Sequence, residues 1–122
     1  MAVIYVLDTN VILYFLRGRL AEPLPAGDYL VSVITEIELL SYASIPPDDE
    51  QLILEFLAAA TLTNLSPATR TAAIQLRRQH RLKLPDAVIA GTALAMDAEL
   101  LTNDVRLARI PELRCRQVRL KP

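Results

Sequence analysis

The sequence predicts an α/β domain in which helices cover both faces of a central, mainly parallel sheet. Strand-like and helix-like segments alternate along the chain, which is the pattern of parallel strands joined by helical crossovers. The first strand-like segment, residues 3–7, is continuously apolar and therefore suits a central strand buried on both faces. The 122 residues contain no internal repeat, linker or low-complexity segment, so we expect one domain over residues 1–122.

The early elements follow from local composition. We expect strands at residues 3–7, 29–31, 61–65, 99–103 and 116–120, and helices at 11–16, 32–41, 49–60, 67–81, 85–98 and 104–109. Gly18 suits the end of the first helix, and Ser32 is a suitable N-cap for the second. The Pro46-Pro47 pair forms a hinge, and the acidic residues after it favour a helix start because of the helix dipole.

The later elements carry similar boundary signals. Residues 61–65 include β-branched side chains and lack glycine and proline, which favours a short strand. Ser66-Pro67 is a cap followed by proline, a common helix start, and Pro85 opens the next helix in the same way. Residues 116–120 alternate between polar and apolar side chains, as an edge strand does.

Composition indicates a cytoplasmic protein that does not enter a membrane. Hydrophobic residues make up 52% of the chain, but uninterrupted apolar runs such as residues 11–16 are far shorter than a membrane span. A span needs roughly 20 apolar residues. The N-terminus lacks the features of a signal peptide. A single cysteine, Cys115, permits no internal disulfide, which fits a reducing compartment.

The charges are divided unevenly between the two parts of the chain. Residues 1–61 contain two basic and nine acidic side chains, whereas residues 62–122 contain eleven basic and five acidic ones. Such a division fits a surface that meets a polyanion beside an acidic site that holds cations. Ordinary surface charge divided by chance is the alternative, and the charge pattern alone does not choose between them.

Four acids stand near the ends of predicted strands or the starts of predicted helices: Asp8, Glu38, Asp86 and Asp104. Each has a structural alternative. Asp8 and Asp104 could be helix caps, Glu38 could complete a Thr-x-x-Glu capping box with Thr35, and Asp86 could simply favour the positive end of a helix dipole.

Taken together, the four acids predict a cation site. The carboxyl ends of parallel strands meet at one sheet edge, where ligands of such folds bind. Carboxylates gathered there would repel one another by ~4 kcal/mol per close pair at intermediate dielectric, and a divalent cation relieves that repulsion. Oxygen ligands suit Mg²⁺ or Mn²⁺, and the sequence has no Cys/His set for zinc.

Four segments carry a family resemblance: Val6-Leu7-Asp8-Thr9-Asn10, Ser32-x-x-Thr35-x-x-Glu38-Leu39, Leu84-Pro85-Asp86-Ala87-x-Ile89-Ala90 and Leu101-Thr102-Asn103-Asp104. In this order and spacing they resemble the PIN domain, and most closely the small VapC-type toxins of bacterial and archaeal toxin–antitoxin pairs. The likeness extends over essentially the whole chain. It implies a three-layer α/β/α sandwich and a Mg²⁺- or Mn²⁺-dependent endoribonuclease.

The resemblance also implies roles for individual residues. Asp8, Asp86 and Asp104 would hold the metal, and Glu38 would either ligate it or assist the attacking water. The family pattern places an acid three residues after Thr35 and directly before a leucine, which selects Glu38 rather than Glu36. Helical geometry sets those two glutamates about 160° apart around the axis. A further group of candidates would orient the carboxylates or the waters: Thr9, Asn10 and Thr102.

Basic and apolar surfaces point to partners. Arg77 and Arg81 share one stripe of a predicted helix and Arg106 follows Asp104 closely, so these arginines are candidates for positioning an RNA substrate. A solvated helix face is the alternative for the first two. Residues 11–16 and 52–57, both in predicted helices, carry more large apolar side chains than a small domain easily covers, although filling a single core is the alternative. Such surfaces mark interfaces, and the resemblance implies a homodimer and a small VapB-type antitoxin.

Other functions fit the sequence less well. A haloacid-dehalogenase-type phosphatase needs a second aspartate two residues after the first, where Asn10 stands. A receiver-type phosphoacceptor domain needs paired acids at the first strand and a lysine after a late strand, and Lys83 is misplaced for that role. A stand-alone PIN nuclease outside a toxin pair, and a catalytically silent PIN domain that binds RNA or protein, remain open alternatives.

Overall fold

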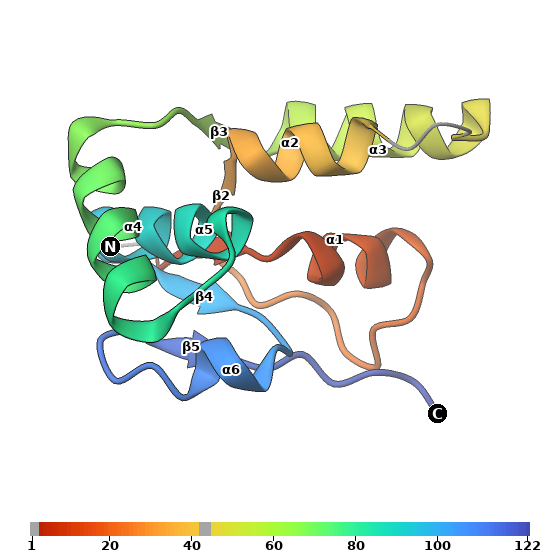
Figure 1. Ribbon diagram of the computed structural model, residues 1–122. Helices are drawn as coiled ribbons and strands as arrows, with labels where there is room; N and C mark the ends of the chain where they lie inside the picture. Colours follow the sequence, from red (N-terminus) through yellow and green to blue (C-terminus); the bar gives the residue numbers. More distant parts are fainter. Residues whose placement is uncertain (1–2, 42–44) are drawn as a thin grey trace.

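A computed structural model describes residues 3–41 and 45–122 (Figure 1). Its five strands form one sheet in the order β3-β2-β1-β4-β5, and every neighbouring pair is parallel. The strands are β1 Ile4–Leu7, β2 Asp28–Ser32, β3 Thr61–Thr63, β4 Glu99–Leu101 and β5 Cys115–Arg116. The most apolar segment, β1, is the central strand, as its continuous hydrophobic run predicts.

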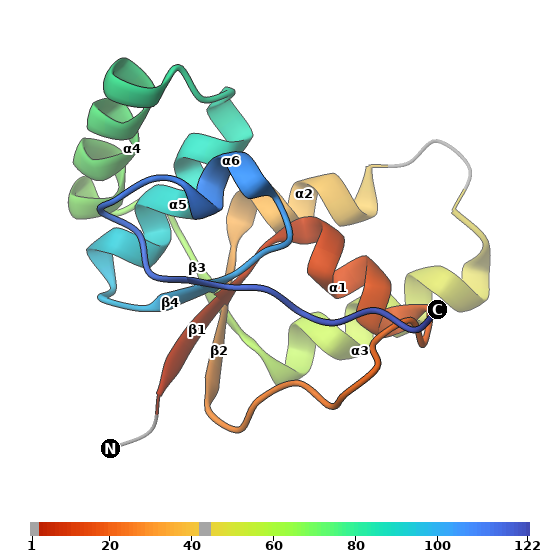
Figure 2. The same cartoon turned by 90° about the horizontal axis from the view of Figure 1, so that it is seen from below.

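Helices cover both faces of this sheet. They are α1 Thr9–Leu16, α2 Val33–Leu40, α3 Pro47–Ala59, α4 Pro67–His80, α5 Leu84–Ala95 and α6 Val105–Ala108. Figure 2 shows α4, α5 and α6 gathered on one side of the strands and α1 and α3 on the other. The predicted α/β sandwich is therefore confirmed.

Two hydrophobic clusters on the two faces of the sheet hold these layers together. Because successive side chains of a strand point to opposite faces, neighbouring residues of β1 belong to different clusters. Val6 packs with the residues of α4, α5 and α6, whereas Tyr5 and Leu7 pack with those of α1, α2 and α3. Leu100 and Leu101 of β4 divide in the same way. The ends of β1 and β4 are therefore packed against helices on both faces of the sheet.

Close packing of α5 against α4 depends on a glycine. A Cβ at Gly91 would lie 2.9 Å from the backbone nitrogen of Ala73, so only glycine permits this helix approach. Seven consecutive residues of α5, Ala87–Ala93, are buried. The middle of α5 is consequently fixed between α4 and the sheet, with Asp86 one residue before the buried stretch.

Several predicted boundaries are wrong by one or two residues: α3 begins at Pro47, within the predicted hinge, α1 begins at Thr9, and β3 and β4 end at Thr63 and Leu101. Two other boundaries are wrong by more. The last strand is not residues 116–120 but Cys115–Arg116, because the chain then leaves β4 and returns to the segment after α1. There Ala21 N–H donates to Arg119 and an isolated antiparallel bridge joins Leu20 to Leu120. The helix expected over 85–98 ends earlier, at Ala95, because Asp97 adopts a left-handed conformation.

No helix in the two described ranges combines the length and the apolar character needed to cross a membrane.

Candidate active site

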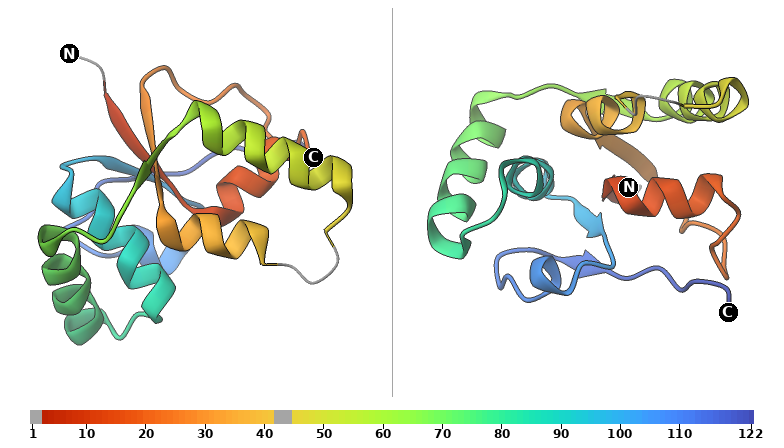
Figure 3. Two further views of the ribbon diagram at one scale, coloured as in Figure 1. Left: turned by 90° about the horizontal axis from the view of Figure 1, so that it is seen from above. Right: turned by 45° about the vertical axis from the view of Figure 1, so that its right-hand side comes forward.

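The four predicted acids come from four elements that meet at the carboxyl edge of the sheet. Asp8 directly follows β1, and Asp104 lies three residues after β4, the strand that pairs with β1. Glu38 is on α2, which begins where β2 ends, and Asp86 is in the first turn of α5. Figure 3 shows α2, α1 and α5 converging at this edge. The strand order therefore brings together residues that are far apart in the sequence.

Asp8 is held by Thr102 rather than used as a helix cap. It occupies the N-cap position of α1, yet its side chain makes no capping hydrogen bond. Instead Thr102 Oγ1 donates to Asp8 Oδ2 at 2.7 Å, and the same hydroxyl accepts from the backbone N–H of Asp104 at 3.0 Å. Because Thr102 is fully buried, this hydroxyl fixes the ends of β1 and β4 relative to each other.

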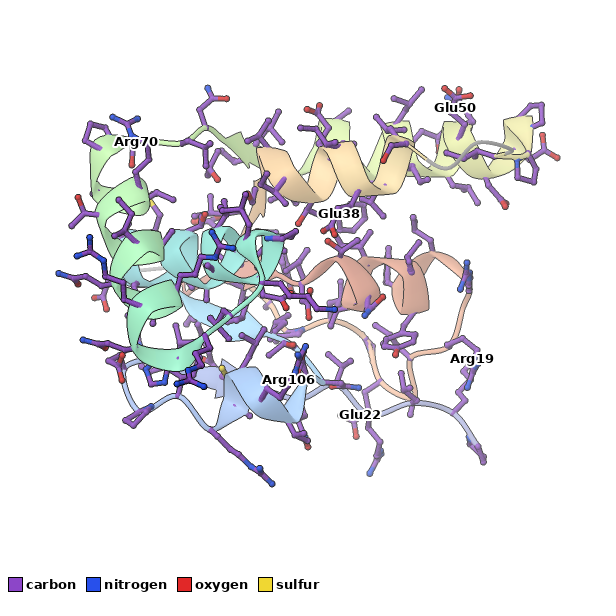
Figure 4. The ribbon with its side chains drawn as sticks, in the orientation of Figure 1. Arg19, Glu22, Glu38, Glu50, Arg70 and Arg106 are labelled. Atoms are coloured by element: carbon purple, nitrogen blue, oxygen red, sulfur yellow. The ribbon has the colours of Figure 1, made fainter. Side chains whose placement is uncertain are left out.

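Glu38 is held by the Thr9 hydroxyl, which in turn lies against the Thr35 hydroxyl. Thr9 Oγ1 donates to Glu38 Oε1 at 2.7 Å and lies 3.1 Å from Thr35 Oγ1. Thr35 lies inside α2, whose N-cap is Ser32, so the capping-box alternative for Glu38 is wrong. Figure 4 shows Glu38 on the side of α2 that faces α1. Thr35 was not among the predicted positioning residues. Its place three residues before Glu38, on the same face of the helix, was the signal that could have identified it.

The acids influence one another electrostatically. Burial raises the pKa of Asp8, the Thr102 hydrogen bond opposes that rise, and the charges of Asp86 and Asp104 add to it. Burial also raises the pKa of Asp86. The positive charge of Arg106 opposes this rise, whereas the negative charges of Asp104 and Glu38 add to it. Asp86, Asp104 and Glu38 therefore each lie close enough to a neighbouring carboxylate to make its ionisation more costly.

Arg106 contacts two of these acids. Its Nη2 and Nε lie 2.8 and 3.2 Å from Asp104 Oδ2 and Oδ1, and Nη2 lies 3.5 Å from Asp86 Oδ2. The backbone N–H of Arg106 also donates to Asp104 Oδ1 at 2.9 Å. Asp104 is thus a helix cap as well, and the guanidinium holds its pKa below the ordinary value. The sequence places Arg106 near the site but does not predict this contact.

The donor chemistry fits Mg²⁺ or Mn²⁺. Carboxylate oxygens are the hard ligands that these ions prefer, and the raised pKa of Asp8 means that a nearby positive charge would stabilise its ionised form. Within residues 3–41 and 45–122, however, no three His, Cys, Asp or Glu side chains are grouped tightly enough to hold a metal ion. Part of the countercharge is supplied by Arg106 instead.

The remaining predicted residues lie outside this network. Asn10 is exposed in the first turn of α1 and takes no part in the site's hydrogen bonds among the described residues. Arg77 on α4 donates to the carbonyl of Leu82, and Arg81 is the left-handed C-cap of that helix. Figure 4 shows Arg70, on the same helix, at the end of the molecule away from Arg106.

Fold and site together define an α/β protein with an acidic site at the carboxyl edge of a parallel sheet. A sequence model of one such class, the PIN domain, matches residues 5–113. The chain belongs to the PIN domain family. Among curated proteins, none matches the chain significantly.

Solved structures of VapBC complexes share this fold. A toxin–antitoxin complex from Klebsiella pneumoniae is 28% identical, with a TM-score of 0.74, and the match covers 89% of this chain and 94% of that one. VapBC-1 from nontypeable Haemophilus influenzae is 25% identical, with a TM-score of 0.73 and 93% and 97% covered. VapBC2 from Rickettsia felis, bound to a promoter DNA fragment, reaches a TM-score of 0.80 at 22% identity, with 95% and 99% covered.

Proposed function

We propose that this protein is a metal-dependent endoribonuclease and the toxin of a VapBC-type pair. The observation that carries the proposal is the hydrogen-bonded framework at the sheet edge, in which buried threonines orient Asp8 and Glu38 beside Asp86 and Asp104. Asp86 and Asp104 share a basic partner in Arg106, but Asp8 is buried and ionises against two neighbouring charges, which a purely structural role would not favour.

Asp8, Asp86 and Asp104 are the proposed ligands of Mg²⁺ or Mn²⁺. Such a cation would lower the pKa of a coordinated water and offset negative charge at the scissile phosphate. Thr102 keeps Asp8 oriented, because its hydroxyl is tied to both strand ends. Glu38, held through Oε1 by Thr9, either adds a ligand or accepts the proton of the attacking water. Cleavage would leave a 5′ phosphate and a 3′ hydroxyl.

RNA would approach the carboxyl edge of the sheet from the side on which Arg106 is exposed. Arg106 is exposed there and can contact a phosphate, since a guanidinium binds carboxylate and phosphate through the same paired N–H groups. Arg77 and Arg81 would extend the basic surface along α4. These three arginines all come from residues 62–122, the basic part of the chain, as do Asp86 and Asp104.

The proposed protein partners are a second copy of the chain and a small VapB-type antitoxin. The Klebsiella pneumoniae relative was solved as a toxin–antitoxin complex. In this chain, α1 exposes Phe15 and α3 exposes Leu52 one turn before Phe56, and the Phe15 and Phe56 rings lie 5.5 Å apart. An apolar surface of this kind suits a protein interface. A short adjacent gene for a DNA-binding protein would support the toxin role over a stand-alone nuclease.

The test is cleavage of total RNA by the purified protein with Mn²⁺, compared with Asp8→Asn. The variant should lose activity by about 100-fold or more, because the neutral amide cannot replace a ligating carboxylate. Its melting temperature in EDTA should stay equal or rise, since the introduced amide oxygen can still accept the Thr102 hydrogen bond and the substitution removes a costly buried charge.

Mapping of the cleavage sites identifies the RNA target in the same experiment. Addition of EDTA should stop cleavage by the wild-type protein, and Mn²⁺ should restore it. RNase activity retained in full by Asp8→Asn would overturn the site assignment. A wild-type protein that binds RNA without cutting it under any divalent cation would favour a silent PIN module.

A further inference from the structure

Arg106 lies against the same carboxylates that are proposed to bind metal. Its guanidinium pairs with both oxygens of Asp104, at 2.8 and 3.2 Å, and reaches Asp86 Oδ2 at 3.5 Å. A single cationic side chain therefore bridges α5 and the segment after β4. A divalent cation that took ligands from these two acids would meet this positive charge at short range.

The Arg106 side chain is freer to move than the two aspartates that it contacts. The Arg106 side chain is 59% exposed, whereas those of Asp86 and Asp104 are 23% and 25% exposed. An exposed arginine can swing into solvent at little cost, because surface ion pairs contribute little to stability. The aspartates are restrained by the helix starts that carry them, and Asp104 also by its own capping bond to the Arg106 backbone.

We propose that the Arg106 guanidinium competes with a divalent cation for the carboxylates of Asp86 and Asp104. Arg106 would then set how tightly the protein holds its metal, and it would leave both acids when the ion binds. This inference rests on the proposed function, since it needs a cation at the acidic edge. It differs from a role in phosphate binding, which by itself leaves the metal affinity unchanged.

Charge relief explains the direction of the effect. The Arg106 guanidinium lies 2.8 Å from Asp104 Oδ2 and 3.5 Å from Asp86 Oδ2 and so offsets part of their negative charge, which a bound divalent cation would do more strongly. With Arg106 neutralised, the acids are left facing chiefly one another, so their attraction for a divalent cation rises. A residue that helped to hold metal would produce the opposite change.

The test is calorimetric titration of the full chain with MnCl₂ after EDTA treatment and dialysis, at fixed pH and ionic strength. Arg106→Gln should bind Mn²⁺ about three- to tenfold more tightly than the wild type, as expected for loss of an exposed competing ion pair. The Arg106 backbone N–H still donates to Asp104 Oδ1, which caps α6, so this variant should fold. Arg109→Gln removes the same charge one turn later and should change the affinity by less than about twofold.

Two further variants separate this inference from the proposed function. Asp8→Asn should bind Mn²⁺ much more weakly than the wild type; equal binding would overturn the metal site, and the competition with it. If Asp8→Asn does weaken binding but Arg106→Gln binds Mn²⁺ no more tightly than Arg109→Gln, the competition alone is overturned. Arg106→Lys keeps the charge without the paired geometry and should fall between wild type and Arg106→Gln. As a second readout, added Mn²⁺ should raise the melting temperature of Arg106→Gln more than that of the wild type.

Discussion

At the scale of single residues, one hydroxyl connects the two central strands at the site. Thr102 donates to Asp8 Oδ2 and accepts from Asp104 N–H, and it has no exposed surface. Thr102→Val keeps the shape of the side chain but removes both hydrogen bonds. We expect a loss of about 1–3 kcal/mol in the free energy of unfolding at neutral pH. Thr102→Ser, which keeps the hydroxyl, is the matched control.

The loss of unfolding free energy caused by Thr102→Val should increase as the pH rises from acidic to neutral. The folded-state pKa of Asp8 is already above its ordinary value of 3.8, so ionisation of Asp8 destabilises the fold as pH rises through that pKa. Loss of the Thr102 donor raises the pKa further. The stability gap between Thr102→Val and wild type should therefore widen from acidic to neutral pH. Urea unfolding in EDTA across this range measures the gap, and a constant gap would contradict the proposed coupling between Thr102 and the charge of Asp8.

At the scale of elements, the phase of α2 decides which of its two glutamates serves the site. Glu38 accepts a hydrogen bond from Thr9, whereas Glu36 lies about 160° away around the helix axis. Glu38→Gln should reduce Mn²⁺-dependent RNA cleavage by about tenfold or more. Glu36→Gln should change it by less than about twofold. Initial rates on one mapped RNA measure both, and the reverse order would show that the other face of α2 serves the site.

Boundaries of elements were predicted well where local chemistry sets them. Ser32 and Ser66 do cap α2 and α4 through their side chains, and Gly18 does follow α1 with positive φ. The end of the chain was predicted less well. Alternating residues after Arg116 looked like a strand, but they pair with the segment after α1, a contact that local composition does not encode.

At the scale of the whole molecule, the alternation of strand-like and helix-like segments was sufficient for the parallel sandwich, but it did not specify the strand order that brings the four acids to one edge. It was not sufficient for contacts that depend on side-chain direction across elements. Neither the Thr9–Thr35 pair nor the Arg106–Asp86 contact could be predicted, since each joins residues 20 or more positions apart through a particular rotamer. The large number of apolar residues in the first and third helices was also visible in the sequence. The sequence did not indicate which of these side chains would be exposed.

That exposed apolar layer supports a prediction about assembly. Phe15 is 42% exposed on α1 and lies against Phe56 of α3, so a partner that covers this layer would bury an aromatic anchor. Phe15→Asp should weaken self-association by about 2 kcal/mol or more, because it places a charge where the partner's apolar surface would pack. Sedimentation equilibrium over a range of concentrations measures the change in the dimer dissociation constant. Ile74→Asp is the matched control, since Ile74 is 52% exposed but lies on α4, in the opposite layer. A wild-type chain that stays monomeric throughout, or two variants that dissociate equally, would show that α1 and α3 do not form the interface.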